Sequence, residues 1–167
     1  ALNLAAGKKA KNSTAYSAAV KYLTVARELP LGDIWQENYS LALDIYSQGT
    51  EVAYLSGDFE EMDKLGGIVL AKAKSLLEKV KIYEIIIVAN IVQTKLIEAI
   101  EIGRDILTQL GTELPEKPTE ADIGATMAEI NNNLQGKSIE ELIELPPMTD
   151  GDRLGAMQIL SKVWPAA

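Results

Sequence analysis

The 167-residue chain contains no cysteine and no histidine. Their absence excludes disulfides, thiol nucleophiles, zinc sites built from Cys and His, and acid–base chemistry by imidazole. It also excludes a phospho-accepting histidine within these residues. Aromatic side chains are few, with one Phe and two Trp. The sequence thus offers few of the groups from which active sites are commonly built, and we expect no metal or cofactor to bind to it.

Basic residues are also under-represented, since 16 Lys and Arg face 24 Asp and Glu and leave a net charge of -8. A nucleic-acid partner therefore has little electrostatic support. The charge is uneven, because residues 113–152 carry ten acidic residues and two Lys. We expect one helical-repeat domain over residues 1–167, with residues 113–152 as an acidic, turn-rich part near its C-terminal end.

No apolar run is long enough to span a bilayer, and no signal peptide is visible. We therefore expect a cytoplasmic protein without a membrane partner. The chain begins at Ala1 without a Met and stops at Ala167. Both ends predict a fragment of a larger protein.

The most informative stretch is residues 54–62, which predicts the bend of a helical hairpin. Gly57 suits the left-handed backbone that ends many helices. Asp58 can cap the next helix, with Glu61 three residues later as in a capping box and Phe59 between them. Ser138 and Glu141 have the same spacing and predict a short helix that ends at the prolines 146–147.

Apolar spacing predicts helices along most of the chain. Residues 80–92 are rich in β-branched side chains, which favours a strand, but the flanking helices and the lack of strict alternation favour a buried helix. Inside the third helix, Gly66 and Gly67 predict a bend or a close approach of a neighbouring helix. The expected helices, after a helical tail over residues 1–11, cover residues 14–30 (with Ser13 or Thr14 as cap), 36–56, 58–77, 80–92, 94–110, 119–136, 138–146 and 149–164.

A small–large–small pattern occurs in the second helix of the first expected hairpin, and the matching places of the next two hairpins follow it only loosely, with Gly in the middle. Such a pattern is typical of tetratricopeptide repeats, in which small residues let helices approach and the large residue fills the gap. The predicted fold is all-α, with antiparallel helical hairpins stacked as a tetratricopeptide-like right-handed superhelix; an irregular helical bundle is the alternative. The three sets lie 43 and 37 residues apart and are Ala19-Leu23-Ala26, Met62-Gly66-Val69 and Ala99-Gly103-Ile106.

Candidate chemistry is weak. Gly136-Lys137-Ser138 resembles the end of a phosphate-binding loop, but Asn131 stands where the motif needs a Gly. Asp150-Gly151-Asp152 lacks the ligand spacing of a calcium loop. Acidic pairs in first helical turns are explained by the helix dipole. We therefore predict no catalytic, cofactor-binding or metal-binding residue.

The last expected helix carries an apolar face of Met157, Leu160 and Trp164. Terminal repeats of such arrays need a polar outer face. Because this face is apolar, we expect it to contact a following helix in the parent protein, or to support a weak homodimer in isolation.

Eight strings along the chain go beyond generic helix-forming sequence. They are AAGKKAK (5–11), AYSAAVKYLTVAREL (15–29), YLSGDFEE (54–61), KAKSLL (72–77), KVKIYE (79–84), GKSIE (136–140), MTD (148–150) and RLGAMQIL (153–160). In this order they resemble the helical region of cyanobacterial multi-sensor signal transduction multi-kinases. The resemblance implies a tetratricopeptide-like segment between a serine/threonine kinase with its P-loop ATPase module and the GAF and histidine kinase domains. ATP would then bind elsewhere in the parent protein.

Two functions are compatible with these residues. The first is a non-catalytic segment that relays conformational change or docks other domains of the same polypeptide or partner proteins. The second is a small-molecule sensor or enzyme with a pocket between helices. Asp44, Glu51 and Asn90 lie among apolar residues and would be its polar groups.

Overall fold

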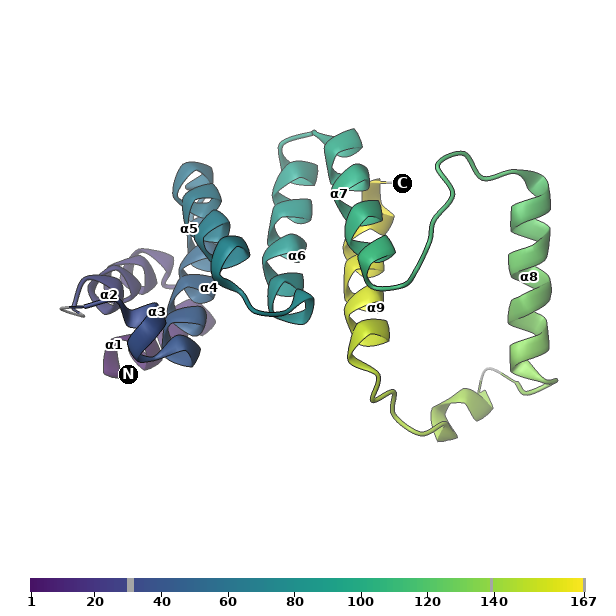
Figure 1. Ribbon diagram of the computed structural model, residues 1–167, viewed down its shortest axis with the longest axis horizontal. Coiled ribbons are helices and arrows are strands. Elements are labelled where there is room, and N and C mark those ends of the chain that lie inside the picture. The colour runs from purple at the N-terminus through teal and green to yellow at the C-terminus, as the bar shows by residue number, and fades with distance from the viewer. Residues whose placement is uncertain (30–31, 139, 167) are drawn as a thin grey trace.

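The computed structural model describes residues 1–29, 32–138 and 140–166, and every regular element within these ranges is helical. The all-α prediction is therefore confirmed for the described part (Figure 1). The elements are α1 (Leu2–Asn12), α2 (Tyr16–Glu28), α3 (Ile34–Glu37), α4 (Tyr39–Leu55), α5 (Phe59–Lys72), α6 (Leu76–Val92), α7 (Leu96–Gln109), α8 (Glu120–Leu134), the 3-10 helix η1 (Glu140–Glu144), α9 (Gly151–Val163) and the 3-10 helix η2 (Trp164–Ala166).

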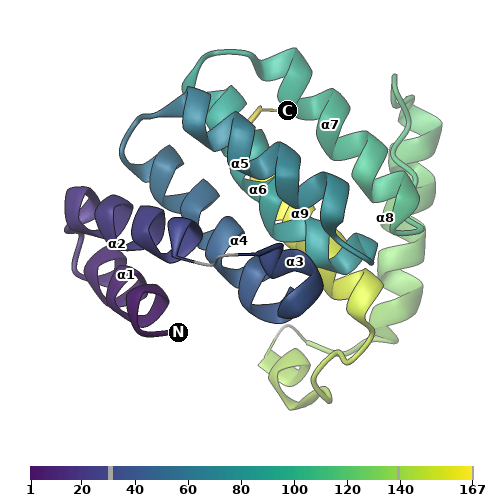
Figure 2. The same ribbon diagram turned by 60° about the vertical axis from the view of Figure 1, so that its left-hand side comes forward.

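Neighbouring helices pack in pairs. α1 packs on α2, α4 on α5 and α6 on α7, while α4 also contacts α2 and α6. The last long helix, α9, returns to contact both α6 and α7 (Figures 1 and 2). α1 and α4 thus each contact the first helix of the next pair, whereas α6 contacts α9.

The same turn ends four helices. A residue with left-handed backbone, φ between +56° and +79°, follows α1, α4, α6 and α7. Its N–H bonds to the carbonyl three residues earlier, and the next N–H bonds to the carbonyl five residues before it, at 2.8–2.9 Å. This is the Schellman arrangement, which satisfies carbonyls that the helix end leaves free. The four residues are Thr14, Gly57, Thr94 and Gly111.

Three of these turns close the hairpins, and they fall at residues 14, 57 and 94. Their spacing of 43 and 37 residues equals that of the three sets that begin at Ala19, Met62 and Ala99. The backbone turn thus recurs at the same interval as these positions, although the side chains there differ.

Close approach between helices occurs at glycines that face large side chains. A Cβ on Gly7 would lie 2.8 Å from Leu23 Cγ, and a Cβ on Gly103 would lie 2.2 Å from Val163 Cγ2. A Cβ on Gly66 would lie 3.3 Å from Ile82 Cγ2, so the expected close approach of a neighbouring helix is confirmed at Gly66. At Gly67 it was wrong, because a Cβ there would have nothing within 4 Å. Each approach lets a large side chain fill the space that a Cβ would take, as dense packing requires.

Residues 80–92 lie within α6, so the helical interpretation is confirmed. The helix begins earlier than expected, because Ser75 and Glu78 form a capping box. The predicted C-terminal boundary of the helix over residues 58–77 was therefore wrong. α5 ends at Lys72, and the backbone of Ala73 is extended.

The predicted cap of the helix over residues 14–30 was also wrong. Ala15 is the N-cap residue of α2 and makes no side-chain cap bond, because Thr14 belongs to the turn that ends α1. The expected end at Pro30 lies outside the described residues. At the last helix, Asp150 is the cap, and its Oδ1 accepts the Arg153 N–H at 3.0 Å.

The left-handed positions generate a stability prediction. Thr14→Gly and Thr94→Gly should each stabilise the fold by about 1 kcal/mol, because a β-branched residue is strained at positive φ and Gly is not. Gly57→Val should destabilise it by a similar amount or more. Urea unfolding provides the measurement. As control, Thr108→Gly changes an exposed position inside α7 and should destabilise slightly. Loss of stability in all three Thr variants would contradict the argument.

Candidate functional site

Opposite charges connect α1, α4 and α6. Lys11 Nζ lies 2.9 Å from Glu51 Oε2, and Lys81 Nζ lies 3.5 Å from Glu51 Oε1. Lys8 forms an ion pair with Asp44, which lies about two helical turns before Glu51 on α4. Glu51 thus contacts cations from two helices at once.

Glu51 is held ionised by these contacts. Its burial raises the pKa, but hydrogen bonds and charge attraction from Lys11 and Lys81 outweigh burial and keep the pKa below 4.5. The side chains of Lys11 and Glu51 are only 16% and 20% exposed, so solvent screens this pair less than an open surface pair. The contact therefore fixes α1 and α6 relative to α4.

A second polar contact connects the start of α4 to the start of α6. Tyr39 Oη donates to Glu78 Oε2 at 2.5 Å, and the Lys74 N–H bonds to the same carboxylate at 2.7 Å. The Lys74 ammonium also lies 4.0 Å from the centre of the Tyr39 ring. The bond from Tyr39 is the main reason why the pKa of Glu78 is lowered. The α5–α6 connection is thus tied to α4.

A shallow hollow of about 190 Å³ lies beside Glu51, between α4, α6 and α9. Side chains of both charge signs border it, although most of its lining surface is apolar. Its lining residues are Glu51, Tyr54, Leu55, Lys81, Glu84, Ile85, Val88 and Lys162.

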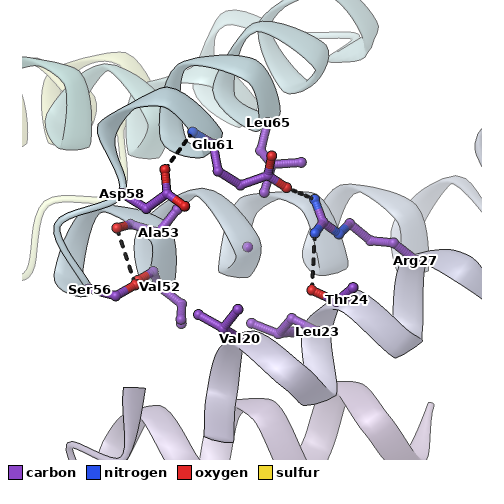
Figure 3. Close-up of a pocket in the computed structure, with 11 residues that line it drawn as sticks. Val20, Leu23, Thr24, Arg27, Val52, Ala53, Ser56, Asp58, Glu61 and Leu65 are labelled. Carbon is purple, nitrogen blue, oxygen red and sulfur yellow. Dashed lines mark hydrogen bonds and ion pairs between the residues drawn. The ribbon is translucent and has the colours of Figure 1, made fainter. Parts of the chain in front are cut away.

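A groove lies between α2 and α5, above α4 (Figure 3). Arg27 Nη1 donates to Glu61 Oε1 at 2.7 Å across it, and Arg27 Nη2 donates to Thr24 at 3.3 Å. Asp58 approaches from the hairpin turn and accepts the Glu61 N–H at 3.0 Å. Glu61 therefore lies in the first turn of α5 and also binds Arg27 of α2.

Within the described ranges, the carboxylate of the Arg27–Glu61 pair is well bonded, but one N–H of the guanidinium is not. Burial raises the pKa of Glu61, but hydrogen bonds from Arg27 and from Lys64, at 3.2 Å, more than compensate and hold it below 4.5. Arg27 Nε is buried and has no hydrogen-bond partner in the described part of the chain. One N–H donor of the guanidinium therefore lacks an acceptor among the described residues.

The dimensions of the groove limit what it can hold. Its enclosed part, about 30 Å³, has room for little more than a water molecule. The open part measures about 550 Å³ and merges with solvent. One of its carboxylates, Glu61, is ionised and paired with Arg27, so Glu61 is not available as a general acid. Among the described residues there is no group of three metal-ligating side chains.

The structure places the residues predicted from the hairpin stretch together. Gly57 has φ +78° with open space around it, and Asp58 is the N-cap of α5. The Phe59 ring lies 6.4 Å from the Tyr54 ring and packs on the cluster between α4, α5 and α6.

Ser138 and Glu141 lie far from this groove, at the start of η1. The Ser138 N–H donates to Glu141 Oε2 at 2.7 Å. The expected short helix forms a 3-10 helix of five residues, all exposed or half-buried. These two residues position a turn and line no site described above.

The three residues predicted as an interaction surface differ in their exposure to solvent. Met157 and Trp164 are 60% and 81% exposed, whereas Leu160 packs on the cluster between α6, α7 and α9. The face that α9 turns inward is made of smaller residues, with Gly155, Ala156, Ile159 and Val163 buried.

The polar residues of the pocket hypothesis are already engaged. Asp44 and Glu51 form the ion pairs with α1 and α6. Asn90 Nδ2 donates to the Ile86 carbonyl of its own helix at 3.0 Å. The three therefore do not converge as ligand-binding groups.

Sequence reasoning missed the cations of both sites, namely Lys8, Lys11, Arg27 and Lys81. A usable signal was present, because the partners of three cross-helix pairs stand 34, 36 and 40 residues apart, about one repeat. Opposite charges at the repeat interval would have indicated contacts between successive hairpins.

Comparison with known proteins gives one informative match. The chain is 24% identical over 158 residues to the hybrid signal transduction histidine kinase G of Dictyostelium discoideum. The match covers 85% of this chain and 4% of the length of that protein. No protein-family model matches the sequence, and no solved structure matches it. The chain is thus similar to a short segment of a signal-transduction kinase.

The Glu51 contacts predict a pH dependence. A carboxylate with a lowered pKa stabilises the fold fully above its unfolded value of 4.5 and loses that contribution as the pH falls through the lower, folded value. Glu51→Gln should therefore cost about 1 kcal/mol at pH 7 and almost nothing at strongly acid pH. Urea unfolding across that range measures it.

The control is Glu101→Gln, which changes an exposed carboxylate of α7 and should have little effect at pH 7. Equal stability of wild type and Glu51→Gln at pH 7 would show that the contact does not hold the three helices.

Proposed function

We propose that this chain is a non-catalytic, tetratricopeptide-like segment of a multi-domain signalling kinase of the multi-sensor type, working in the cytoplasm. Its role is to position or connect other modules of the same polypeptide, or partner proteins. ATP binds to the kinase modules of the parent protein and not to this segment.

The observation that carries the proposal is the repeated hairpin. Three consecutive helix pairs end their first helices in the same left-handed turn, at residues 14, 57 and 94. Three ion pairs at about one repeat length join the first helix pair to the second, and Lys81 of α6 joins the second pair to the third through Glu51. Such quasi-regular stacking supports a right-handed superhelix of the tetratricopeptide type and a single domain that includes α9.

The signalling context rests on the similarity to the Dictyostelium histidine kinase. It agrees with the resemblance to multi-sensor kinases found in the strings of the sequence. Both support the proposal that the chain is a segment of a larger signalling kinase. No helix in the described ranges has the length and apolar character needed to cross a bilayer.

The surface best suited to other modules is the row formed by α1, α4, α6 and α9, with the charged hollow beside Glu51. Charged side chains of both signs favour specific but reversible docking, because electrostatic complementarity sets orientation more than affinity. Relay through this row would use the Glu51 contact, which couples α1 and α6 through α4.

A direct test measures nucleotide chemistry in the isolated chain. Incubation with ATP and Mg²⁺ should release no phosphate and give no autophosphorylation, and titration calorimetry should detect no ATP binding. The matched control is Lys137→Ala, in the loop that resembles a phosphate-binding motif. Turnover at constant specific activity through purification, lost in Lys137→Ala, would contradict the proposal and assign the activity to that loop.

We also propose a weak homodimer through the C-terminal helix. Met157 and Trp164 stay largely exposed there, and Leu160 lies at their edge. Sedimentation at rising concentration should show association that Trp164→Glu abolishes, because a charge would be desolvated at the contact. Leu29→Glu, an exposed apolar position at the other end, is the control. A strict monomer for every variant would exclude the dimer.

A further inference from the structure

The segment between α7 and α9 leaves the helical array and carries α8 away from it (Figure 1). Every residue of α8 is exposed except Leu134, which is half-buried. Packing against the other helices is minimal, whereas α9 rejoins α6 and α7 directly. The helix is therefore held by its own backbone and by the capping box of Thr119 and Asp122.

One face of α8 is apolar. Ile123, Met127, Ile130 and Leu134 follow a spacing of four, three and four residues, which places them on one stripe of a helix. The first three are 58%, 55% and 47% exposed. Asn132 lies on the opposite face. An apolar stripe of this kind normally faces a core or a partner. Within the described residues, Ile123 and Met127 only border an open hollow of about 200 Å³ that they share with Pro115 and Pro118, and no other helix covers the stripe.

The charge around the stripe is negative. Residues 113–152 hold ten acidic residues and two Lys, and the remainder of the chain holds 14 of each sign. α8 itself carries Glu120, Asp122 and Glu129 without a cation. A second copy would bring either another acidic α8, which repels, or an array without net charge. Charge complementarity therefore favours a different protein with positive charge.

We propose that α8 docks a basic amphipathic helix of another protein. The apolar face of that helix would cover Ile123, Met127 and Ile130, and its Lys or Arg residues would meet the acidic side chains beside the stripe. Fifteen residues give α8 a length of about 22 Å, enough for three turns of contact. Helix pairing with apolar anchors at this spacing is an established recognition mode. The inference is independent of the role proposed for the array.

A fluorescence anisotropy titration of the whole chain tests it. The probe is a labelled synthetic peptide with Leu on one helical face and Lys on the other. We expect saturable binding that Met127→Glu weakens about tenfold or more, because a carboxylate would be buried against the Leu face. Asn132→Glu adds the same charge on the opposite face and should leave affinity unchanged or slightly higher. Circular dichroism checks that both variants keep their helix.

The outcomes separate docking from simple charge attraction. If both variants bind the peptide more tightly, or if a scrambled peptide of equal composition binds as well, the stripe makes no contact and the proposal is wrong. Absence of binding also overturns it. Self-association that persists in Trp164→Glu but is lost in Met127→Glu would assign the stripe to a second copy instead. None of these results affects the ATP test of the array.

Discussion

The helical array depends on backbone approach at glycines that face large side chains. Gly7 receives Leu23 between α1 and α2, Gly49 receives Leu65 between α4 and α5, and Gly103 receives Val163 between α7 and α9. A Cβ at any of these positions would lie less than 3.0 Å from its neighbour. The overlap would be costly at Gly7, where the branch carbon of Leu23 is met, and at Gly103, where a methyl of the β-branched Val163 is met, whereas at Gly49 only the end of the Leu65 side chain has to move. The first two contacts therefore limit how closely their helices can pair once a Cβ is added.

Charged contacts act on top of this packing. The close pairs set the distance within hairpins and between α7 and α9, whereas the contacts of Glu51, Glu61 and Glu78 connect neighbouring hairpins. Partly exposed pairs of this type contribute little stability individually. Their larger effect is on register, since each carboxylate accepts bonds from more than one donor and loses some of them if a helix slides. These contacts therefore connect the positions of successive hairpins, as the proposed relay role would require.

Local signals in the sequence predicted local structure. Gly57 and Asp58 indicated a hairpin because Gly suits positive φ and Asp accepts free N–H groups, and the helix over residues 80–92 followed from its helical neighbours. Ser75 was overlooked although its capping box with Glu78 was readable, so the third helix was drawn too long. Thr14 and Thr94 were not predictable as left-handed residues, because β-branched residues avoid that region and only the packed hairpin imposes it. The partners of Arg27 and Lys11 needed the stacking of hairpins, which no single helix encodes.

The long segment between α7 and α9, which carries α8, lowers the stability of the helical array little. The entropy of closing a flexible loop grows only by about 0.6 kcal/mol for each doubling of its length, so α9 can return to α6 and α7 across a long insertion. The return is secured by buried residues of α9, among them Ile159 and Val163. The array and this segment are therefore energetically separable: substitutions on the stripe of α8 remove no buried contact of the array. Substitutions in α8 can therefore change the binding of the proposed partner without changing the array, in which the glycine contacts set the distances between helices.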